Sequence, residues 1–226
     1  MNITIVNRQC NFSNISATKE RPEWFNRERC FNSILRETFA VPHVNLVVFF
    51  DGQPSDDHFI NKYQVELVTK ECGSGSQSYK ESLNYALYQS NSDYFYFVED
   101  DYLHKPGWLN VVKEGFNEGF DYFTMYDHAD KYSELYKGLN SEIRTTDSCH
   151  WRSTPSTTDT FACSRETLKE DYGVHEYFSS FFDYSLDHKR FCELRNRGRT
   201  IMSCMPGWST HVETDLMSPS INWSLV

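Results

Sequence analysis

Two continuous apolar runs, rich in β-branched and aromatic residues, constrain the fold of this chain most strongly. They are VNLVVFF at Val44–Phe50, in which Asn45 is the one polar residue, and YFYFV at Tyr94–Val98. A strand that is apolar at almost every position must be covered on both faces, as are the strands of a parallel sheet between two layers of helices. The 226 residues are enough for one such domain with a full core.

Helical patterns alternate with these and other strands. Shorter strand patterns occur at Ile3–Val6, Gln64–Thr69, Tyr122–Met125, Thr160–Cys163 and Ile201–Cys204. Helical patterns occur at Glu23–Phe39, Tyr79–Gln89, Trp108–Phe116 and Asp183–Arg197, while 127–155 is polar and without a clear period. This alternation predicts an α/β fold with a largely parallel sheet. Ligands of such sheets bind beyond the carboxyl ends of the strands, so a site is expected at those ends.

Composition and charge exclude several classes of protein. Hydrophobic residues make up 39% of the chain, which excludes a disordered protein, and the formal net charge of −10 argues against a nucleic-acid partner. No apolar run reaches the roughly 18 residues of a membrane span, and the N-terminus carries no signal-peptide pattern. The cysteines are scattered without a C-x-x-C pair. We therefore expect reduced thiols and a soluble cytoplasmic protein, in a host cytoplasm if the source is viral.

Three consecutive acids, Glu99, Asp100 and Asp101, directly follow the strand YFYFV. Adjacent carboxylates repel one another, and a divalent cation that also binds a diphosphate removes this cost. Carboxylate oxygens favour hard ions such as Mg²⁺ or Mn²⁺. An acidic turn that caps the following helix explains the same residues, because carboxylates stabilise helix N-termini. On the triplet alone both interpretations remain open.

Two further strand ends carry polar residues. Asn7 and Arg8 follow Ile3–Val6, and Asp51 follows VNLVVFF. An arginine can pair with a phosphate through two hydrogen bonds, and a carboxylate can accept from a uracil N–H or from ribose hydroxyls. Asp51 and the glycine after it are equally a common turn dipeptide. The chain has no G-x-x-x-x-G-K-[ST] and no early G-x-G-x-x-G motif, which argues against P-loop NTPases and Rossmann dehydrogenases.

The segment SLNYAL at 82–87, followed by YFYFVEDD, resembles the small GT-A glycosyltransferases. In that family a helix with a small-x-Asn segment leads to an apolar strand that ends in an Asp-x-Asp motif. The resemblance implies a GT-A fold, with a Rossmann-like, mostly parallel mixed sheet and flanking helices, in one domain over 1–226. The nucleotide-binding half would cover about 1–105 and the acceptor-side half about 106–226. Glu99 in place of the first Asp, and Leu83 where many relatives have Arg, depart from the family pattern.

The resemblance also implies roles for individual residues. Asp101 would be a direct metal ligand, and His211, in MPGWSTHVE, would be the ligand supplied near the C-terminus. Because imidazole suits Mn²⁺ better than Mg²⁺, this pair favours manganese. A lone histidine in a loop is, by itself, more often structural. The nucleotide-sugar donor would be bound by Asn7, Arg8, Asp51, Glu99 and Asp100.

An acceptor hydroxyl needs a carboxylate base that faces the anomeric carbon of the donor. In inverting relatives this base stands at the start of a helix beyond a strand such as Thr160–Cys163, and Asp183 fits that place. Asp187 lies one turn later on the same helix face, and Asp159 is better placed if the enzyme retains configuration. Each acid is also explained as an ordinary cap or first-turn residue of a helix.

Together these features predict a metal-dependent glycosyltransferase that moves a sugar from a nucleotide-sugar, preferably UDP-linked, to a glycan or glycoprotein, with inversion slightly preferred. Mn²⁺ is the expected cofactor and Mg²⁺ the alternative. A sugar nucleotidyltransferase is an alternative, although no Gly-rich basic segment follows the first strand. So is a non-catalytic glycan-binding or structural module, although such a module would have lost the acids.

We interpret the basic residues between His188 and Arg199 mainly as a solvated helix surface.

Overall fold

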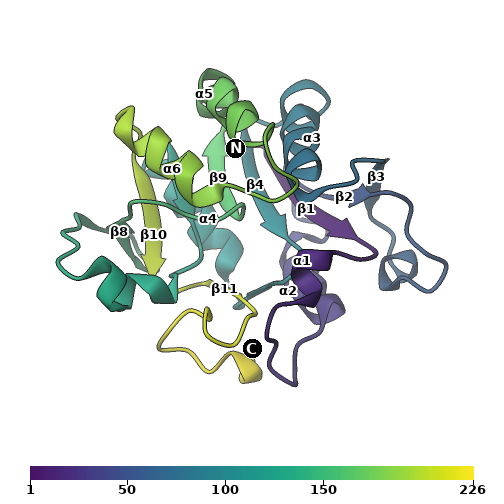
Figure 1. Cartoon of the computed structure of the whole chain (residues 1–226), viewed down its shortest axis with the longest axis horizontal. Coiled ribbons are helices and arrows are strands. Elements are labelled where there is room, and N and C mark those ends of the chain that lie inside the picture. The colour runs from purple at the N-terminus through teal and green to yellow at the C-terminus, as the bar shows by residue number, and fades with distance from the viewer.

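A nine-stranded mixed sheet forms the centre of the protein in the computed structural model, which describes residues 1–226 (Figure 1). Its strands lie in the order β3-β2-β1-β4-β9-β6-β10-β8-β7. Strands β1 to β4 are parallel, β9 runs antiparallel between β4 and β6, and β10 is parallel to β6. The predicted α/β fold with a mostly parallel mixed sheet is confirmed. The strands are β1 Ile3–Cys10, β2 Val44–Asp51, β3 Glu66–Lys70, β4 Tyr94–Glu99, β6 Tyr122–Thr124, β7 Ile143–Thr145, β8 His150–Ser153, β9 Phe161–Ser164 and β10 Ile201–Met205.

Helices cover both faces of this sheet, as the apolar strands require (Figure 1). In β4, Tyr96 and Val98 pack in a core with α4, whereas Phe95 and Phe97 pack in a second core with α3, α5 and α6. Alternate residues of one strand thus point into two cores, which explains why YFYFV has no polar position. The helices are α2 Arg27–Thr38 and α4 Trp108–Asn117 on one side, and α3 Gly75–Tyr88, α5 Arg165–Phe178 and α6 Asp187–Asn196 on the other.

β1 is longer than the predicted strand Ile3–Val6. Its parallel pairing continues on both sides, with Arg8 opposite Phe49 of β2 and Glu99 of β4. Asn7 and Arg8 therefore lie inside a strand, and the prediction that they follow its end is wrong. Polar residues inside a buried strand require polar partners, and this requirement shapes the site described below.

Helix boundaries differ from the predicted ones for local reasons. α2 begins only at Arg27, because the Asn26 side chain caps the helix by accepting a backbone N–H bond from its first turn. α6 begins at Asp187, so Asp183 precedes this helix instead of opening it. α5 is absent from the predicted elements; it starts directly after β9, with Ser164 as its cap.

The polar stretch 127–155 is more regular than predicted. It contains β7 and β8, which extend the sheet antiparallel beyond β10. Two short 3₁₀ helices, Ala129–Tyr132 and Glu134–Tyr136, precede these strands. The stretch therefore forms an edge of the sheet instead of an irregular excursion.

A separate two-stranded sheet brings the late part of the chain to the end of β4. It pairs β5 (Tyr102–His104) with β11 (Ser209–His211) in antiparallel register, so that His211 lies opposite Tyr102. The backbone N–H of Val212 donates to the carbonyl oxygen of Asp101 at 2.9 Å. Pairing between segments far apart in the sequence thus places His211 beside Asp101.

The segment that follows residue 17 and the C-terminal segment lie side by side, below the sheet in the view of Figure 1. α1 (Asn14–Ala17) is a single turn, and the residues after it run beside the C-terminal part of the chain. The N–H of Thr214 donates to the carbonyl oxygen of Glu20 at 2.9 Å, and the Arg29 guanidinium donates to the carbonyl oxygen of Val226 at 2.6 Å. The segment between α1 and α2 is thereby held next to β11.

No helix of the protein has both the length and the apolar character needed to cross a bilayer. All seven cysteines have free thiols, as the scattered spacing predicts.

Phe161 of β9 offers a test of the core that supports the site. It is fully buried and contacts the rings of Phe97, Tyr79 and Phe191. Phe161→Ala is expected to lower the free energy of unfolding by about 3–5 kcal/mol, because the lost burial leaves a cavity that neighbours cannot fill. Denaturant titration measures this change. Phe39→Ala, at a side chain that is 73% exposed, should change the free energy by less than about 0.5 kcal/mol, and equal effects of the two would contradict the assigned core.

Candidate functional site

Asp101 and His211 form the centre of the candidate site, just beyond the end of β4. The Asp101 side chain is 2% exposed, and its Oδ2 lies 2.9 Å from Nε2 of His211. The His211 ring stacks on the ring of Tyr102 at a centroid distance of 5.3 Å, which fixes its orientation. The two residues that the sequence predicts as metal ligands are therefore neighbours.

Two cations from the N-terminal segment share the same carboxylate. Lys19 Nζ lies 2.9 Å, and Arg21 Nη2 2.7 Å, from Asp101 Oδ2. Lys19 Nζ is also 2.9 Å from Nε2 of His211. Although burial alone would raise the pKa of Asp101, the charge and hydrogen bond of His211, together with Lys19 and Arg21, hold that pKa well below its usual value. Asp101 is therefore ionised throughout the neutral range.

The other two acids of the triplet also have protein partners. Arg8 Nη2 lies 3.2 Å from Glu99 Oε1, and Arg27 Nε lies 3.2 Å from Asp100 Oδ2. Burial raises the pKa of Glu99 to about 7 despite the opposing charge of Arg8. Burial and the charge of Asp101 raise the pKa of Asp100 to about 6. The repulsion between the three adjacent carboxylates is thus countered by arginine and lysine side chains of the protein itself.

Asp159 is held between two arginines on the other side of Glu99. Arg190 Nη1 lies 2.5 Å from Asp159 Oδ1, and Arg8 Nη2 lies 3.5 Å from Asp159 Oδ2. Arg190 is fully buried, and its guanidinium lies 3.9 Å from the centroid of the Tyr79 ring. The interpretation of the basic run as a solvated surface is wrong for Arg190, because α6 turns this residue toward the sheet.

Asp187 and Asp183 occupy different environments. Asp187 is the first residue of α6, where its Oδ1 accepts from the N–H of His188 at 2.7 Å. Burial and the charge of Asp159 raise the pKa of Asp187 to about 6, although the charge of His211 opposes this rise. Asp183 is exposed in the segment before α6. Of the two, Asp187 belongs to the charged centre.

Asn7 and Asp51 already make structural hydrogen bonds. Asn7 is 1% exposed; its Nδ2 donates to the carbonyl oxygen of Val98 at 3.3 Å, and its Oδ1 accepts from Gln9 at 2.7 Å. We therefore do not retain Asn7 among the donor contacts. Asp51 Oδ1 accepts from the N–H groups of Cys72 and Gly73 at 2.8 and 3.1 Å, which shapes the loop before α3.

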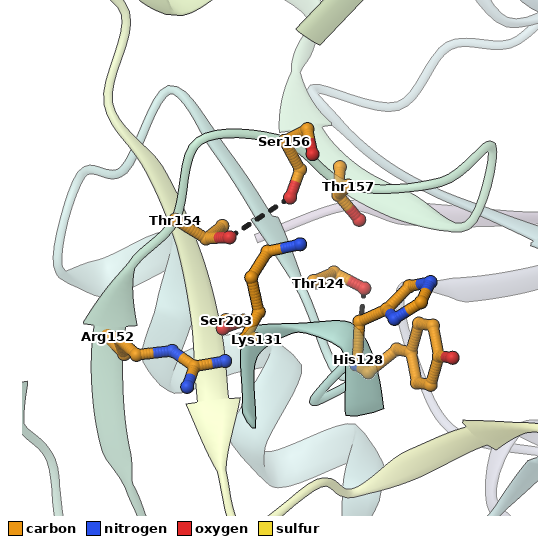
Figure 2. A pocket seen from close by; sticks show the side chains of 9 residues that line it. Thr124, His128, Lys131, Arg152, Thr154, Ser156, Thr157 and Ser203 are labelled. Carbon is orange, nitrogen blue, oxygen red and sulfur yellow. Dashed lines mark hydrogen bonds between the residues drawn. The ribbon is translucent and has the colours of Figure 1, made fainter. Parts of the chain in front are cut away.

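A small polar cavity is lined by residues of β6, β8 and β10 and of the loops beside them. Figure 2 shows the Lys131 ammonium pointing toward Thr154 and Ser156, with Arg152 and Ser203 nearby. The cavity measures about 10 Å³, roughly the space of one water molecule. Both cations pair with acids, Lys131 with Asp130 and Arg152 with Asp127, each at 2.7 Å. Its size suits one ordered water better than a sugar ring, so we do not assign it as the donor site. The lining residues are Thr124, Tyr126, His128, Lys131, Arg152, Thr154, Ser156, Thr157 and Ser203.

The spacing of the possible ligand atoms, the carboxylate oxygen of Asp101 and the ring nitrogen of His211, fits a divalent cation. The separation of 2.9 Å between Asp101 Oδ2 and His211 Nε2 is close to the roughly 3 Å between adjacent ligands of an octahedral ion with bonds of about 2.1 Å. Asp101 Oδ1 is buried without a hydrogen-bond partner. No set of three or more His, Cys, Asp or Glu side chains is arranged as a complete metal site.

Comparison with known proteins agrees with the fold and identifies the family. The family model described as glycosyl transferase family 2 matches residues 23–188. Since this match spans more than half of the chain, the protein belongs to that family, and the predicted relationship to the GT-A glycosyltransferases is confirmed. The matched range includes Asp101, Asp159 and Asp187 but ends before Arg190 and His211 and begins after Lys19. No curated protein sequence matches the chain.

Solved structures with the same fold have low sequence identity to this chain. CMP:2-keto-3-deoxy-manno-octonic acid synthetase in complex with CTP has a TM-score of 0.57 at 12% identity, over 92% of both chains. TarS from S. aureus has a TM-score of 0.53 at 15% identity, over 90% of this chain and 35% of TarS. Its fragment 1–349 gives 0.52 at 16% identity, over 90% of this chain and 58% of the fragment. This chain therefore spans only about a third of the first TarS chain.

Arg190 offers a test of the buried charge network. Arg190→Met should lower the free energy of unfolding by about 3–5 kcal/mol, because Asp159 then keeps its buried charge with only the distant arm of Arg8. Arg197→Met, at the C-cap of the same helix, is the control; its side chain is 59% exposed and pairs with Glu193 in the i, i+4 arrangement. The control should lose less than about 0.5 kcal/mol in urea titrations. If the two variants lose equal stability, Asp159 does not depend on Arg190.

Proposed function

We propose that this protein is a metal-dependent glycosyltransferase that transfers a sugar from a nucleotide-sugar, preferably UDP-linked, to a hydroxyl group of a glycan or glycoprotein. Membership of family 2 supports the transfer reaction. The observation that carries the proposal is the buried pairing of Asp101 with His211 at the carboxyl end of β4. A ligand site at such a strand end is where an α/β sheet binds its substrates.

Asp101 and His211 would hold the divalent cation, preferably Mn²⁺, whose chemistry as a Lewis acid stabilises the departing diphosphate. Two other side chains would contact the nucleotide-sugar directly. Arg8, paired with Glu99, supplies cationic N–H groups beside the acids. Asp51 uses one carboxylate oxygen for its loop, and the other is available to a uracil N–H or a ribose hydroxyl.

We choose Asp187 over Asp183 as the base, because its side chain is the more buried of the two and interacts with the charges of the site. A carboxylate that removes a proton from an acceptor hydroxyl works best when its pKa lies near the working pH. The raised pKa of Asp187, about 6, meets this requirement while leaving the group ionised at pH 7 to 8. Asp183 is exposed outside the charged centre. Asp159 is committed to Arg190 and Arg8, so its role is to position those arginines. An inverting reaction with Asp187 as its base follows from this choice.

Donor binding tests the proposal directly. Thermal shift and calorimetry with a panel of nucleotide-sugars should give binding that requires Mn²⁺ and is tightest for a UDP-linked donor. Asp101→Asn should abolish the metal-dependent part, because it removes the ligand charge at the pair with His211. Asp93→Asn, an exposed acid in the loop before β4, is the control and should bind normally. Absence of binding by every nucleotide-sugar, with or without metal, would contradict the transferase proposal.

The pH profile of turnover tests Asp187. A carboxyl with a pKa raised to about 6 is protonated at lower pH, so turnover should fall about tenfold per pH unit below 6 and level off above 7. Asp187→Asn should cut turnover by about 10²–10⁴-fold with little change in donor affinity. Donor binding measured at each pH separates this effect from loss of metal. Asp183→Asn is the matched control; if it abolishes turnover while Asp187→Asn does not, the base is Asp183.

A sugar nucleotidyltransferase is the second candidate, and one observation favours it. The synthetase structure with CTP covers 92% of both chains, whereas the TarS chains extend well beyond this one. The two reactions differ in their products. A nucleotidyltransferase releases pyrophosphate from a nucleoside triphosphate in the presence of a sugar, whereas a glycosyltransferase releases a nucleoside diphosphate from a nucleotide-sugar. Pyrophosphate release with CTP or UTP would decide for the second candidate.

A further inference from the structure

Lys19 occupies the position between the two side chains that would hold the metal. Its ammonium lies 2.9 Å from Asp101 Oδ2 and 2.9 Å from His211 Nε2, and these two atoms are themselves 2.9 Å apart. When the ring proton of His211 is on Nδ1, which lies 3.6 Å from Glu213 Oε2, Nε2 accepts from Lys19 just as Asp101 Oδ2 does. Two acceptors so close together repel each other unless a cation bridges them. The ammonium is therefore the cation that this pair of acceptors requires.

Lys19 and Arg21 differ in how firmly they are attached. Arg21 also donates to the carbonyl oxygen of Val212 and to Ser16, 3.1 Å away, and its guanidinium lies 4.5 Å from the centroid of the Phe25 ring. The Lys19 ammonium has only Asp101 and His211 as partners, and its side chain is 22% exposed. Its flexible four-carbon stem can turn out of the site without disturbing the backbone. Arg21 stays in place, whereas Lys19 can leave.

We propose that Lys19 is an internal counter-ion that exchanges with the divalent metal at Asp101 and His211. The proposal rests on the proposed function. An ammonium and a divalent cation cannot both contact the same two atoms, because their charges repel at this distance. Lys19 fills the position in the free enzyme. When metal and donor bind, Lys19 moves onto the donor diphosphate, the nearest group that needs a cation.

The exchange makes the metal and the nucleotide depend on each other. Metal without nucleotide has to expel Lys19 into water, where the ammonium gains no new partner inside the protein. Metal with nucleotide expels Lys19 onto the diphosphate, which compensates for the lost contacts. Each ligand therefore strengthens the binding of the other by the same factor. Removal of the Lys19 charge removes both the competition and part of this coupling.

Mn²⁺ binding, measured by electron paramagnetic resonance and calorimetry with and without UDP, tests the exchange. In the wild-type chain, Mn²⁺ should bind roughly tenfold or more tightly with UDP than without it. Lys19→Met should bind Mn²⁺ alone roughly tenfold more tightly than wild type, with a smaller gain from UDP. Lys19→Gln, which keeps a polar side chain, should behave like Lys19→Met and guards against a folding defect of the apolar variant.

Two controls make the outcome specific. Lys62→Met removes an exposed lysine that pairs with Glu28, and Mn²⁺ affinity should not change. Asp101→Asn should abolish Mn²⁺ binding in both the wild-type and the Lys19→Met background. If Mn²⁺ still binds after Asp101→Asn, the metal lies elsewhere and the exchange is wrong.

The exchange and the proposed function can fail separately. Equal or weaker Mn²⁺ binding by Lys19→Met without UDP would overturn the exchange, while metal-dependent transfer would leave the proposed function intact. If no variant binds Mn²⁺ but wild type binds UDP and Lys19→Met does not, Lys19 permanently replaces the metal. That result would overturn the exchange and the metal dependence together, and transfer activity in the presence of a chelator would show whether the glycosyltransferase assignment survives.

Discussion

The buried carboxylate of Asp101 is the group on which the arrangement of the site depends. Its side chain is 2% exposed, so its charge has to be compensated within the protein. The compensation comes from Lys19 and Arg21 of the N-terminal segment and from His211 of β11. Neither segment belongs to the nine-stranded sheet. The sheet therefore fixes the position of the acid, and the need for counter-charges brings both terminal parts of the chain to it.

Arg8 connects this centre to a second group of charges. It lies inside β1, where the backbone is paired with strands on both sides, and it contacts both Glu99 and Asp159. Asp159 in turn fixes Arg190, which is stacked on Tyr79 of α3. Tyr79 itself packs against Phe161 in the core. Because buried ions depend on each other's presence, a change in one residue of this chain of contacts alters the next. The charged groups of the site are thus connected by direct contacts to the hydrophobic core beneath them.

The sequence predicts the elements whose pattern is local. VNLVVFF and YFYFV can only be strands covered on both faces, and the acids after YFYFV mark the site. It fails where the decisive partner is distant in the sequence. Asn7 and Arg8 belong to β1 because β2 and β4 pair with them, and no pattern within β1 shows where that pairing stops. The predicted start of α6 is four residues too early, about one turn, and so places the exposed Asp183 in the helix. The burial of Arg190 depends on Asp159 and Tyr79, which are distant in the sequence. Lys19 and Arg21 carry no local signal, since their partner Asp101 lies 82 and 80 positions away.

The charges of the site balance although the chain as a whole is acidic, with a formal net charge of −10. With the acids counted as ionised and His211 counted as neutral, five carboxylates face five cations: Glu99, Asp100, Asp101, Asp159 and Asp187 against Arg8, Lys19, Arg21, Arg27 and Arg190. A diphosphate and a divalent cation carry opposite charges of about the same size, so they can enter together without disturbing this balance. Either one alone leaves an excess charge in a poorly hydrated region, where it is costly. Most of the cations are fixed by several contacts, and Lys19 is the one whose only partners are Asp101 and His211, the two side chains that we propose as metal ligands. A balanced site with one movable cation therefore favours the joint binding of metal and donor over the binding of either alone.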